Sequence, residues 1–243
     1  METILLLLIS IVPVIGLAYY IYDKDYEKES SSLLFKLIMG GILVVIPAAS
    51  IESLAGNLFP DSYNMTTIQF LVYILIDIAF VEEVFKWFMV YIFSYNSREF
   101  DYMYDAVVYS SFVSLGFASV ENLLYVIHST IHVGLMRAII SVPAHASFGI
   151  LMGIFIAYAK KFDIKRKHEK SALCLISSIF IPSLAHGIYD YCLYMNSKTY
   201  LTFFIIFVSV LFVISFIMLR KMAKERREIY NTRTLTISDL HKK

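Results

Sequence analysis

Charged residues are scarce in this sequence, and their scarcity excludes a soluble globular domain. Only 17% of the 243 residues are Asp, Glu, Lys or Arg, whereas 58% are hydrophobic and 16% are aromatic. A soluble domain is typically about 25% charged and about 45–50% apolar. The mean hydropathy of +0.68 points the same way. The many aromatic residues also exclude an intrinsically disordered chain.

Cysteine is nearly absent, and so is any strong net charge. Cys174 and Cys192 are the only cysteines, and both lie in apolar runs. We interpret them as free thiols rather than as a disulfide framework or a thiolate metal cage. Lys and Arg number 21 against 20 Asp and Glu, which gives a formal net charge of +1. This balance predicts no nucleic-acid partner.

The sequence is rich instead in apolar stretches of about 20 residues, the length that crosses about 30 Å of hydrocarbon. Each must be helical, because backbone amides in lipid have no other partners. The predicted fold class is therefore all-α, a polytopic transmembrane helix bundle of about seven spans. The first span lacks a basic segment before it and a cleavage site after it, so we do not expect a signal peptide. The predicted spans are Thr3–Tyr22, Leu33–Ala55, Thr67–Phe93, Asp105–His128, Leu135–Ala159, Ala172–Tyr194 and Tyr200–Leu219.

Lys and Arg are concentrated in alternate connections, which predicts the orientation of the chain. They follow the odd-numbered spans, for example at Lys24 and Lys28, at Arg98 and between residues 160 and 170. Because basic residues in short connections stay on the cytoplasmic side, we expect the N-terminus outside and the C-terminus inside. Lys198 is the one exception among the outer connections. We expect a membrane domain over residues 1–220 and a basic cytoplasmic tail over residues 221–243.

Ionisable side chains lie inside four consecutive predicted spans. Such groups are costly in hydrocarbon and predict a functional site by default. Their restriction to neighbouring helices predicts one buried site between them. The groups are Glu82, Glu83 and Lys86 in the third span, Glu121 in the fourth, Arg137 and His145 in the fifth, and His186 and Asp190 in the sixth.

Helical spacing predicts which of these groups meet. Lys86 lies one turn from both Glu82 and Glu83, so it can pair with one carboxylate and leave the other as an acid or base. An ion pair at the end of the span is the alternative interpretation. His186 and Asp190 are four residues apart, so the carboxylate can hold the ring in one tautomer.

The remaining polar positions allow more than one interpretation. Glu121 and Tyr125 share a helix face, so we expect the tyrosine hydroxyl to orient the carboxylate. His145 precedes glycines on its own face. Glutamates and histidines brought together suit hydrolysis, either by a carboxylate base that activates water or by a bound Zn²⁺ ion. The glycines either give a substrate strand room or serve helix packing; they are Gly149, Gly153 and Gly187.

Together these motifs resemble the PrsW family of intramembrane proteases. The resemblance rests on four short segments in order, each on its own span, and it extends over nearly the whole chain. The segments are Glu82-Glu83-Val84-Phe85-Lys86, then Gly116-Phe117-Ala118 with Glu121-Asn122 and Tyr125, then His145 with Gly149 and Gly153, then His186-Gly187 with Tyr189-Asp190.

The resemblance implies a multi-pass protease of the bacterial cell membrane, related to the CAAX protease and bacteriocin-processing group. Its implied partner in the bilayer is a single-pass membrane protein substrate such as an anti-sigma factor. The first, site-1 cut in that substrate would activate an extracytoplasmic-function sigma factor. The implied catalytic residues are Glu82, Glu83, His186, His145 and Glu121, with Lys86, Asn122, Tyr125 and Asp190 in support.

Members of the family are described both as metalloproteases and as glutamic proteases, and the residues favour the glutamic type. No H-E-x-x-H segment is present, although such a segment would set two metal ligands and a base on one helix. A zinc site would have to be assembled from Glu121, His145 and His186 on three helices. The glutamic mechanism needs no cofactor, and Zn²⁺ is the alternative.

Other interpretations stay open. A proton- or ion-coupled transporter would use buried Glu, His and Asp groups equally well. An inactive relative would serve as a membrane scaffold or immunity factor, although a scaffold has no need of costly charges in lipid. Serine catalysis has less support, because no G-x-S-x-G setting surrounds Ser141, Ser147 or Ser183.

Overall fold

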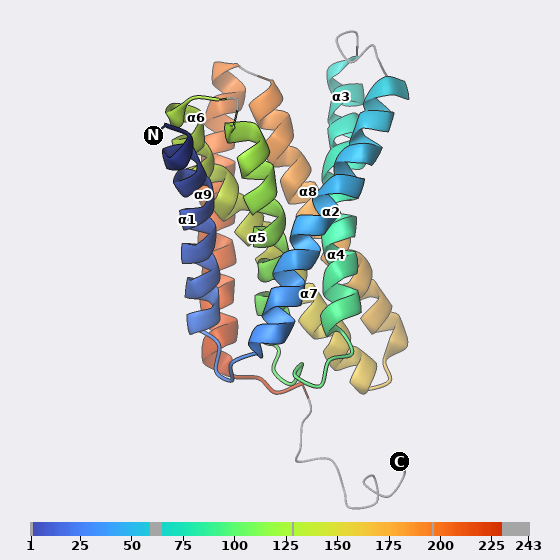
Figure 1. Cartoon of the computed structure of the whole chain (residues 1–243). Helices are drawn as coiled ribbons and strands as arrows, with labels where there is room; N and C mark the ends of the chain where they lie inside the picture. The colour runs from blue at the N-terminus through green and yellow to red at the C-terminus, as the bar shows by residue number, and fades with distance from the viewer. Residues whose placement is uncertain (1, 59–64, 128, 196, 230–243) are drawn as a thin grey trace, which may run out of the picture.

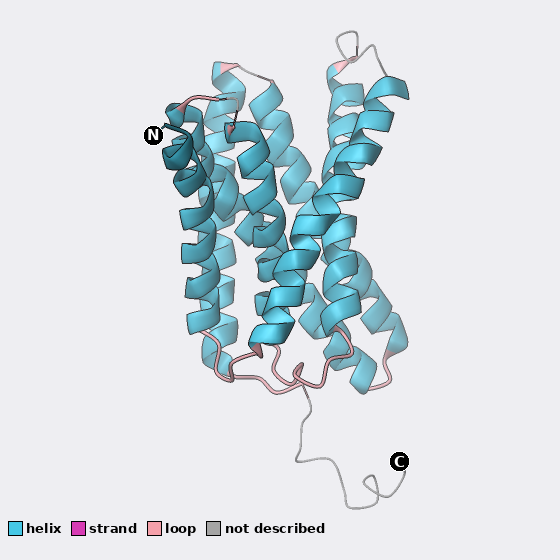
Figure 2. Cartoon of the chain, in the orientation of Figure 1, coloured by secondary structure: helices cyan, strands magenta, loops and turns pink. Residues whose placement is uncertain are grey.

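The computed structural model describes residues 2–58, 65–127, 129–195 and 197–229, and these residues are almost entirely helical (Figure 2). They form seven rods, because α3 continues through the π-helical segment η2 into α4, and α6 continues through the π-helical segment η3 into α7. The elements are α1 (Glu2–Asp23), α2 (Ser31–Leu58), α3 (Thr67–Tyr73), η2 (Ile74–Phe80), α4 (Val81–Ser94), α5 (Asp105–Val126), α6 (Ile131–Met136), η3 (Arg137–Ser141), α7 (Val142–Ile164), α8 (His168–Tyr194) and α9 (Lys198–Glu225).

The predicted all-α, polytopic bundle is confirmed. Six rods have the length and hydropathy of a membrane span. The seventh, from Thr67 to Ser94, falls outside this group because it carries Asp77 and the three charged residues at positions 82, 83 and 86. Several rods run a few residues beyond the predicted limits, and His128, the predicted end of the fourth span, lies outside the described residues. The chain is thus a multi-pass membrane protein.

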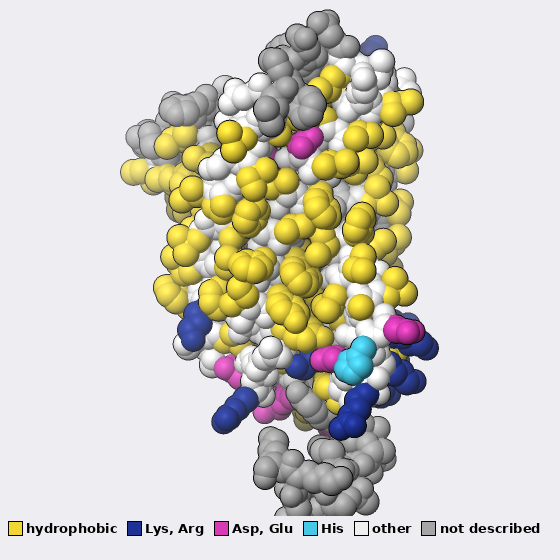
Figure 3. Space-filling model, turned by 90° about the vertical axis from the view of Figure 1, so that its right-hand side faces the viewer, with side chains coloured by type: hydrophobic (Ala, Val, Ile, Leu, Met, Phe, Trp, Pro, Cys, Tyr) yellow, Lys and Arg dark blue, Asp and Glu magenta, His cyan; other side chains and the backbone are white. Residues whose placement is uncertain are grey.

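The two ends of the bundle differ in charge. One end, here called the basic end, carries the connections 24–30, 95–104 and 165–167 and residues 226–229 (Figure 1). Lys and Arg gather at this end in the space-filling view, below a broad hydrophobic belt (Figure 3). Helix α1 begins at the opposite end, where α2, α5 and α8 end. This distribution is the one on which the predicted orientation rests, with the basic end facing the cytoplasm.

Helices α5 and α7 form the centre of the bundle. In the membrane-spanning stretches of α5 and of the rod 131–164, 72% of the residues are buried, against 17% in α1 and 22% in α9. The outer helices therefore face lipid with most of their surface. Side chains that project from α5 and α7 are shielded from lipid, which is the environment that a buried polar site requires.

Glycines allow the central helices to approach closely. A Cβ atom at Gly153 would collide with the α5 backbone at Ala106, and one at Gly41 in α2 would collide with the α5 backbone at Val113. A Cβ atom at Gly149 would likewise collide with the α5 backbone, and one at Gly187 would collide with the side chain of Leu75. Contacts of this kind favour helix packing over room for a substrate strand as the role of Gly149, Gly153 and Gly187.

Both π-helical segments lie just before residues of the predicted site. In η3 the wider turns precede Pro143, which has no backbone N–H to donate to an α-helical partner. In η2 they bring Leu75 against Gly187 of α8. Because π-helical turns change the angular position of all following side chains, these segments help to set the directions of Glu82, Glu83 and His145.

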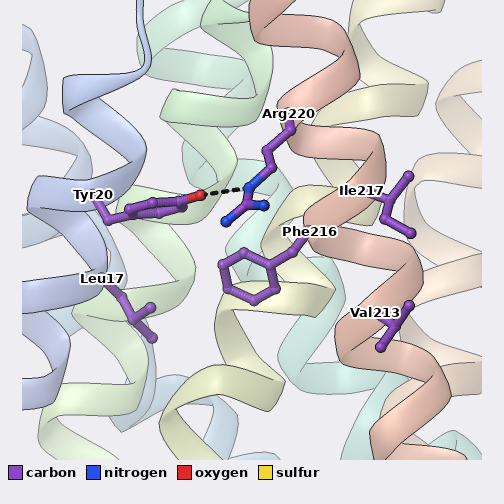
Figure 4. A pocket seen from close by; sticks show the side chains of 6 residues that line it. All are labelled: Leu17, Tyr20, Val213, Phe216, Ile217 and Arg220. Carbon is purple, nitrogen blue, oxygen red and sulfur yellow. Dashed lines mark hydrogen bonds between the residues drawn. The ribbon is translucent and has the colours of Figure 1, made fainter.

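A shallow groove of about 440 Å³ lies between α1 and α9, near the basic end. Figure 4 shows its wall, where Arg220 Nε donates a hydrogen bond of 2.9 Å to the Tyr20 hydroxyl. The groove is formed by two peripheral helices that contribute none of the predicted site residues. Its lining residues are Leu17, Tyr20, Val213, Phe216, Ile217 and Arg220.

Candidate active site

Two adjacent carboxylates and an ammonium group form the centre of a buried polar network. Glu82, Glu83 and Lys86 lie on the first two turns of α4 and are 6%, 0% and 0% exposed. Lys86 Nζ donates to Glu82 Oε2 at 3.0 Å and to Glu83 Oε1 at 2.8 Å. The expectation that lysine would pair with only one carboxylate is therefore wrong. A lysine at i+3 and i+4 reaches both side chains at once when all three are held in the same apolar pocket.

His186 of α8 joins this centre from the opposite side. Its Nδ1 lies 3.0 Å from Glu83 Oε1 and 3.9 Å from Glu82 Oε2. Its Nε2 lies 3.3 Å from Asp190 Oδ2, so the predicted i, i+4 pairing of this histidine is confirmed. Each ring nitrogen thus faces a carboxylate, and the ring also stacks on Phe148 with centroids 4.7 Å apart. These contacts fix the orientation of the imidazole.

His145 of α7 links the centre to a second carboxylate. Its Nδ1 lies 3.4 Å from Lys86 Nζ, and its Nε2 lies 2.6 Å from Glu121 Oε2. Lysine can only donate, so Nδ1 is the accepting nitrogen and Nε2 carries the proton. The Nε2–H group faces Glu121 as a short polar contact rather than an aligned hydrogen bond, since this oxygen has no partner of hydrogen-bonding geometry.

Arg137 holds the outer carboxylate in place. Its Nη2 donates to Glu121 Oε1 at 2.9 Å, and its Nε donates to Asn122 Oδ1 at 2.8 Å. The guanidinium group also lies over the Tyr125 ring, 4.0 Å from the centroid. The expectation that the Tyr125 hydroxyl orients Glu121 is replaced by this arrangement. The tyrosine is 52% exposed and contributes its ring, while arginine from the neighbouring rod supplies the donors.

The structure therefore brings together all the predicted catalytic residues from four rods. Aromatic rings close the network from lipid, with Lys86 Nζ 4.1 Å from the centroid of the Phe117 ring. No serine hydroxyl contacts the ring of His145 or His186 among the hydrogen bonds of the described residues, although Ser114 donates to the main-chain carbonyl of His145 at 2.6 Å. Ser183 donates instead to the Ile179 carbonyl of its own helix at 2.8 Å, as Ser147 does to the Pro143 carbonyl at 2.9 Å.

Glu52 of α2 lies near this network, and the sequence analysis did not consider it. Its carboxyl is within electrostatic range of Glu82 and Glu121, and its Oε1 is buried without a hydrogen-bond partner. An isolated carboxylate inside an apolar run was the available signal.

One group of ligand atoms in this network is close enough for a metal ion. Glu82, Glu83 and His186 each offer an atom, and these atoms lie within 4.8 Å of one another. The structure thus groups different residues from the expected zinc set of Glu121, His145 and His186. Helix α4 supplies two donors side by side, whereas the expected set drew one donor from each of three helices.

The formal charges of the network do not balance within the described residues. Four carboxylates, at positions 82, 83, 121 and 190, face two permanent cations, Lys86 and Arg137. With both histidines neutral, two negative charges remain in a region that excludes water. A divalent metal ion or two protons on the histidines would neutralise them.

The fold and the network define a multi-pass membrane protein with a polar reaction site inside its helix bundle. A family model described as PrsW family intramembrane metalloprotease matches residues 29–219. Protease PrsW of Oceanobacillus iheyensis is 38% identical over 184 residues, which cover 76% of this chain and 80% of that protein. Protease PrsW of Halalkalibacterium halodurans is 35% identical over 209 residues, which cover 85% and 91% respectively. Protease PrsW of Bacillus subtilis is 34% identical over 191 residues, which cover 76% and 80%. No solved structure matches the chain.

The chain belongs to the PrsW family of intramembrane metalloproteases. The predicted family, the multi-pass bacterial membrane location and the assignment as a membrane-embedded hydrolase are thereby confirmed. The comparisons give no support to the transporter interpretation.

Proposed function

We propose that this chain makes the first, site-1 cut in a membrane-anchored anti-sigma factor and so activates an extracytoplasmic-function sigma factor. The observation that carries the proposal is the convergence of Glu82, Glu83 and His186 inside the bundle of a chain from a protease family. Hydrolysis requires a group that activates water and a group that stabilises the oxyanion. Acidic and imidazole side chains in contact supply both.

The donor set fits a divalent metal ion. Two carboxylates and one imidazole are ligands that Zn²⁺ accepts in catalytic sites, where a fourth position stays open for water. Glu83 Oε2 is buried without a hydrogen-bond partner, which leaves an oxygen available for a ligand bond. A metal ion held by Glu82, Glu83 and His186 would supply Lewis-acid activation of water and of the scissile carbonyl.

The remaining residues of the network orient this centre. Asp190 faces the second nitrogen of His186, a contact that fixes ring orientation and tautomer in metal sites. Lys86 partly neutralises the two glutamates and lies next to His145. In our proposal Lys86 donates to the developing oxyanion, and His145 Nδ1 accepts from Lys86 and holds its ammonium group in place. Arg137 holds Glu121 so that its carboxylate keeps His145 oriented.

This proposal favours the metal over the metal-free glutamic mechanism that the sequence alone favoured. The reasons are the family's description, the grouping of three donors and the excess of two negative charges. In the glutamic alternative, Glu82 or Glu83 deprotonates water directly and protonated histidines balance the charge. Both mechanisms use the same side chains, so only dependence on metal separates them.

The cut is expected near the outer face of the membrane. His186 lies eight residues before Tyr194, which ends α8 at the end opposite the basic end. At 1.5 Å per residue this is about 12 Å from the end of the helix. A peptide bond within a substrate helix is protected by its own hydrogen bonds, so an unwound or juxtamembrane segment is the expected target.

The test is cleavage of a single-pass anti-sigma factor by the purified protein in liposomes. The proposal expects cleavage by the unchanged chain and its loss in Glu82→Gln and Glu83→Gln variants, with Glu169→Gln, an exposed residue of α8, as control. A strong chelator should abolish cleavage, and Zn²⁺ should restore it. Cleavage that persists in both glutamine variants contradicts the proposed function. Loss in the variants combined with full resistance to the chelator supports the glutamic mechanism instead.

A further inference from the structure

Three buried carboxylates form a second cluster at the basic end, away from the site described above. Asp25 and Glu29 belong to the connection between α1 and α2, and Asp105 is the first residue of α5. They are 6%, 6% and 0% exposed. Each offers an oxygen within 4.8 Å of the other two. Like charges at this separation in a buried place repel one another strongly.

No side chain of the described residues forms an ion pair with this cluster. No Lys or Arg nitrogen in the described parts of the chain lies within 4.0 Å of the three carboxylates. The nearby ammonium group of Lys28 donates to the main-chain carbonyls of Tyr22, Asp23 and Asp25 at 2.6, 3.0 and 3.0 Å. Both oxygens of Asp25, Oε2 of Glu29 and Oδ1 of Asp105 are buried without a hydrogen-bond partner.

A tyrosine outside the acidic group also points to a missing ligand. Tyr109, one turn along α5, is 0% exposed. Its hydroxyl group faces the carboxyl of Glu29 but completes no hydrogen bond of normal geometry. A buried hydroxyl without a partner is costly, and native structures satisfy such groups with water or an ion.

The position of Asp105 is fixed by the backbone. Its Oδ2 accepts hydrogen bonds from the amide groups of Asp101 at 3.0 Å and Tyr102 at 2.8 Å. The other oxygen, Oδ1, is thereby held buried and without a partner. The connection that carries Glu29 is fixed as well, because the backbone amide and hydroxyl of Ser30 donate to Glu99 at 2.7 and 2.9 Å. The cluster is thus preformed.

We propose that Asp25, Glu29 and Asp105, with the Tyr109 hydroxyl, bind a hard divalent cation, Mg²⁺ or Ca²⁺. The donors are all oxygen atoms, which these ions prefer, and the absence of His and Cys from this group distinguishes it from the zinc-type donor set at the active site. The bound cation ties the α1–α2 connection to the start of α5, the helix that carries Glu121 and Asn122 of the active site.

The experiment measures thermal unfolding of the full-length protein in detergent after removal of metals by a chelator and dialysis. Addition of Mg²⁺ or Ca²⁺ up to roughly 10 mM should raise the unfolding temperature in a saturable way. The Asp25→Asn/Glu29→Gln double variant should lose this response or require at least about tenfold more cation. Glu27→Gln, which removes an exposed carboxylate from the same connection, should keep the full response.

Mn²⁺ binding, followed by electron paramagnetic resonance, makes the result specific. The Glu83→Gln variant should retain this binding, and the Glu29→Gln single variant should weaken it. The single variant also replaces the double variant if the double variant does not fold. The readout does not involve cleavage, so the cation site and the proposed proteolytic function can fail separately. No cation-dependent stabilisation, or a response that survives the double variant or disappears in Glu83→Gln, would overturn the proposal. If only one of Mg²⁺ and Ca²⁺ raises the unfolding temperature, that ion is the one that the site binds.

Discussion

The bundle contains two buried acidic clusters that differ in how their charge is balanced. At the active site, Lys86 contacts both Glu82 and Glu83, and two histidines and an arginine lie within the same network. At the basic end, the cluster of Asp25, Glu29 and Asp105 has no such partner among the described side chains. Burial alone therefore does not dictate what neutralises a carboxylate in this fold. The active site supplies much of its own positive charge, whereas the basic end depends on a proton or a cation from outside.

The largest expected effect is on catalysis, and it applies to one cluster only. Replacing Glu83 by Gln or His186 by Ala should lower the rate of substrate cleavage by roughly 10²–10⁴-fold, because in the proposed mechanism each removes a group that acts on the reacting atoms. Asp25→Asn should leave cleavage at saturating Mg²⁺ or Ca²⁺ within a few-fold of the unchanged chain. A similar loss of cleavage rate in Asp25→Asn would show that the basic end takes part in catalysis. The two clusters would then not differ in function.

The second expected effect concerns stability. Lys86→Met leaves two buried carboxylates without their cation and should lower the free energy of unfolding by roughly 3–5 kcal/mol. Chemical denaturation in detergent measures this loss, with Lys167→Met, an exposed position, as the control. Adding Glu83→Gln to Lys86→Met should recover part of the stability, since it removes one uncompensated charge. If the double variant is no more stable than the single one, electrostatic neutralisation is not the role of Lys86.

A smaller effect is expected at the edge of the active site. Arg137→Lys keeps the charge but loses the planar group that donates to Glu121 and Asn122 together. Groups that orient catalytic residues typically contribute about 10–100-fold, so kcat should fall by that factor while KM changes little. Arg98→Lys, at an exposed position of the basic end, should leave both constants unchanged. A rise in KM at constant kcat would assign Arg137 to substrate binding instead.

The smallest effect tests the basic end. Tyr109→Phe removes one neutral oxygen donor from the proposed cation site and should weaken cation binding by about 0.5–1.5 kcal/mol. The shift of the cation concentration at half-maximal stabilisation measures it, with Tyr19→Phe at a lipid-facing position as control. Unchanged cation affinity would remove Tyr109 from the site while leaving the three carboxylates in place.

The spans and the main site residues could be predicted from the sequence because both follow from the cost of polar groups in lipid. A run of about 20 apolar residues has one stable conformation there, and a glutamate or histidine inside such a run stands out. The i, i+4 relation of His186 and Asp190 needs only local geometry. These inferences depend on neighbours within one helix.

The features that sequence analysis missed depend on contacts between helices. The sequence analysis did not consider Glu52, and only the packing of α2 brings this residue within electrostatic range of Glu82. The partner of Glu121 comes from the next rod, so the local tyrosine was a misleading candidate. Asp25 and Glu29 stood in a connection full of charges, where burial cannot be inferred from composition.

The number of residues in η2 and η3 matters because it sets the direction of the site side chains that follow these segments. In an α-helix, removing one residue turns everything beyond it by about 100°. Loss of a single residue from Ile74–Phe80 would point both glutamates of α4 away from His186. This would happen although all the site residues were still present in the sequence. A loss within Arg137–Ser141 would do the same to His145. Point substitutions of the apolar residues in these two segments should be far better tolerated than deletions.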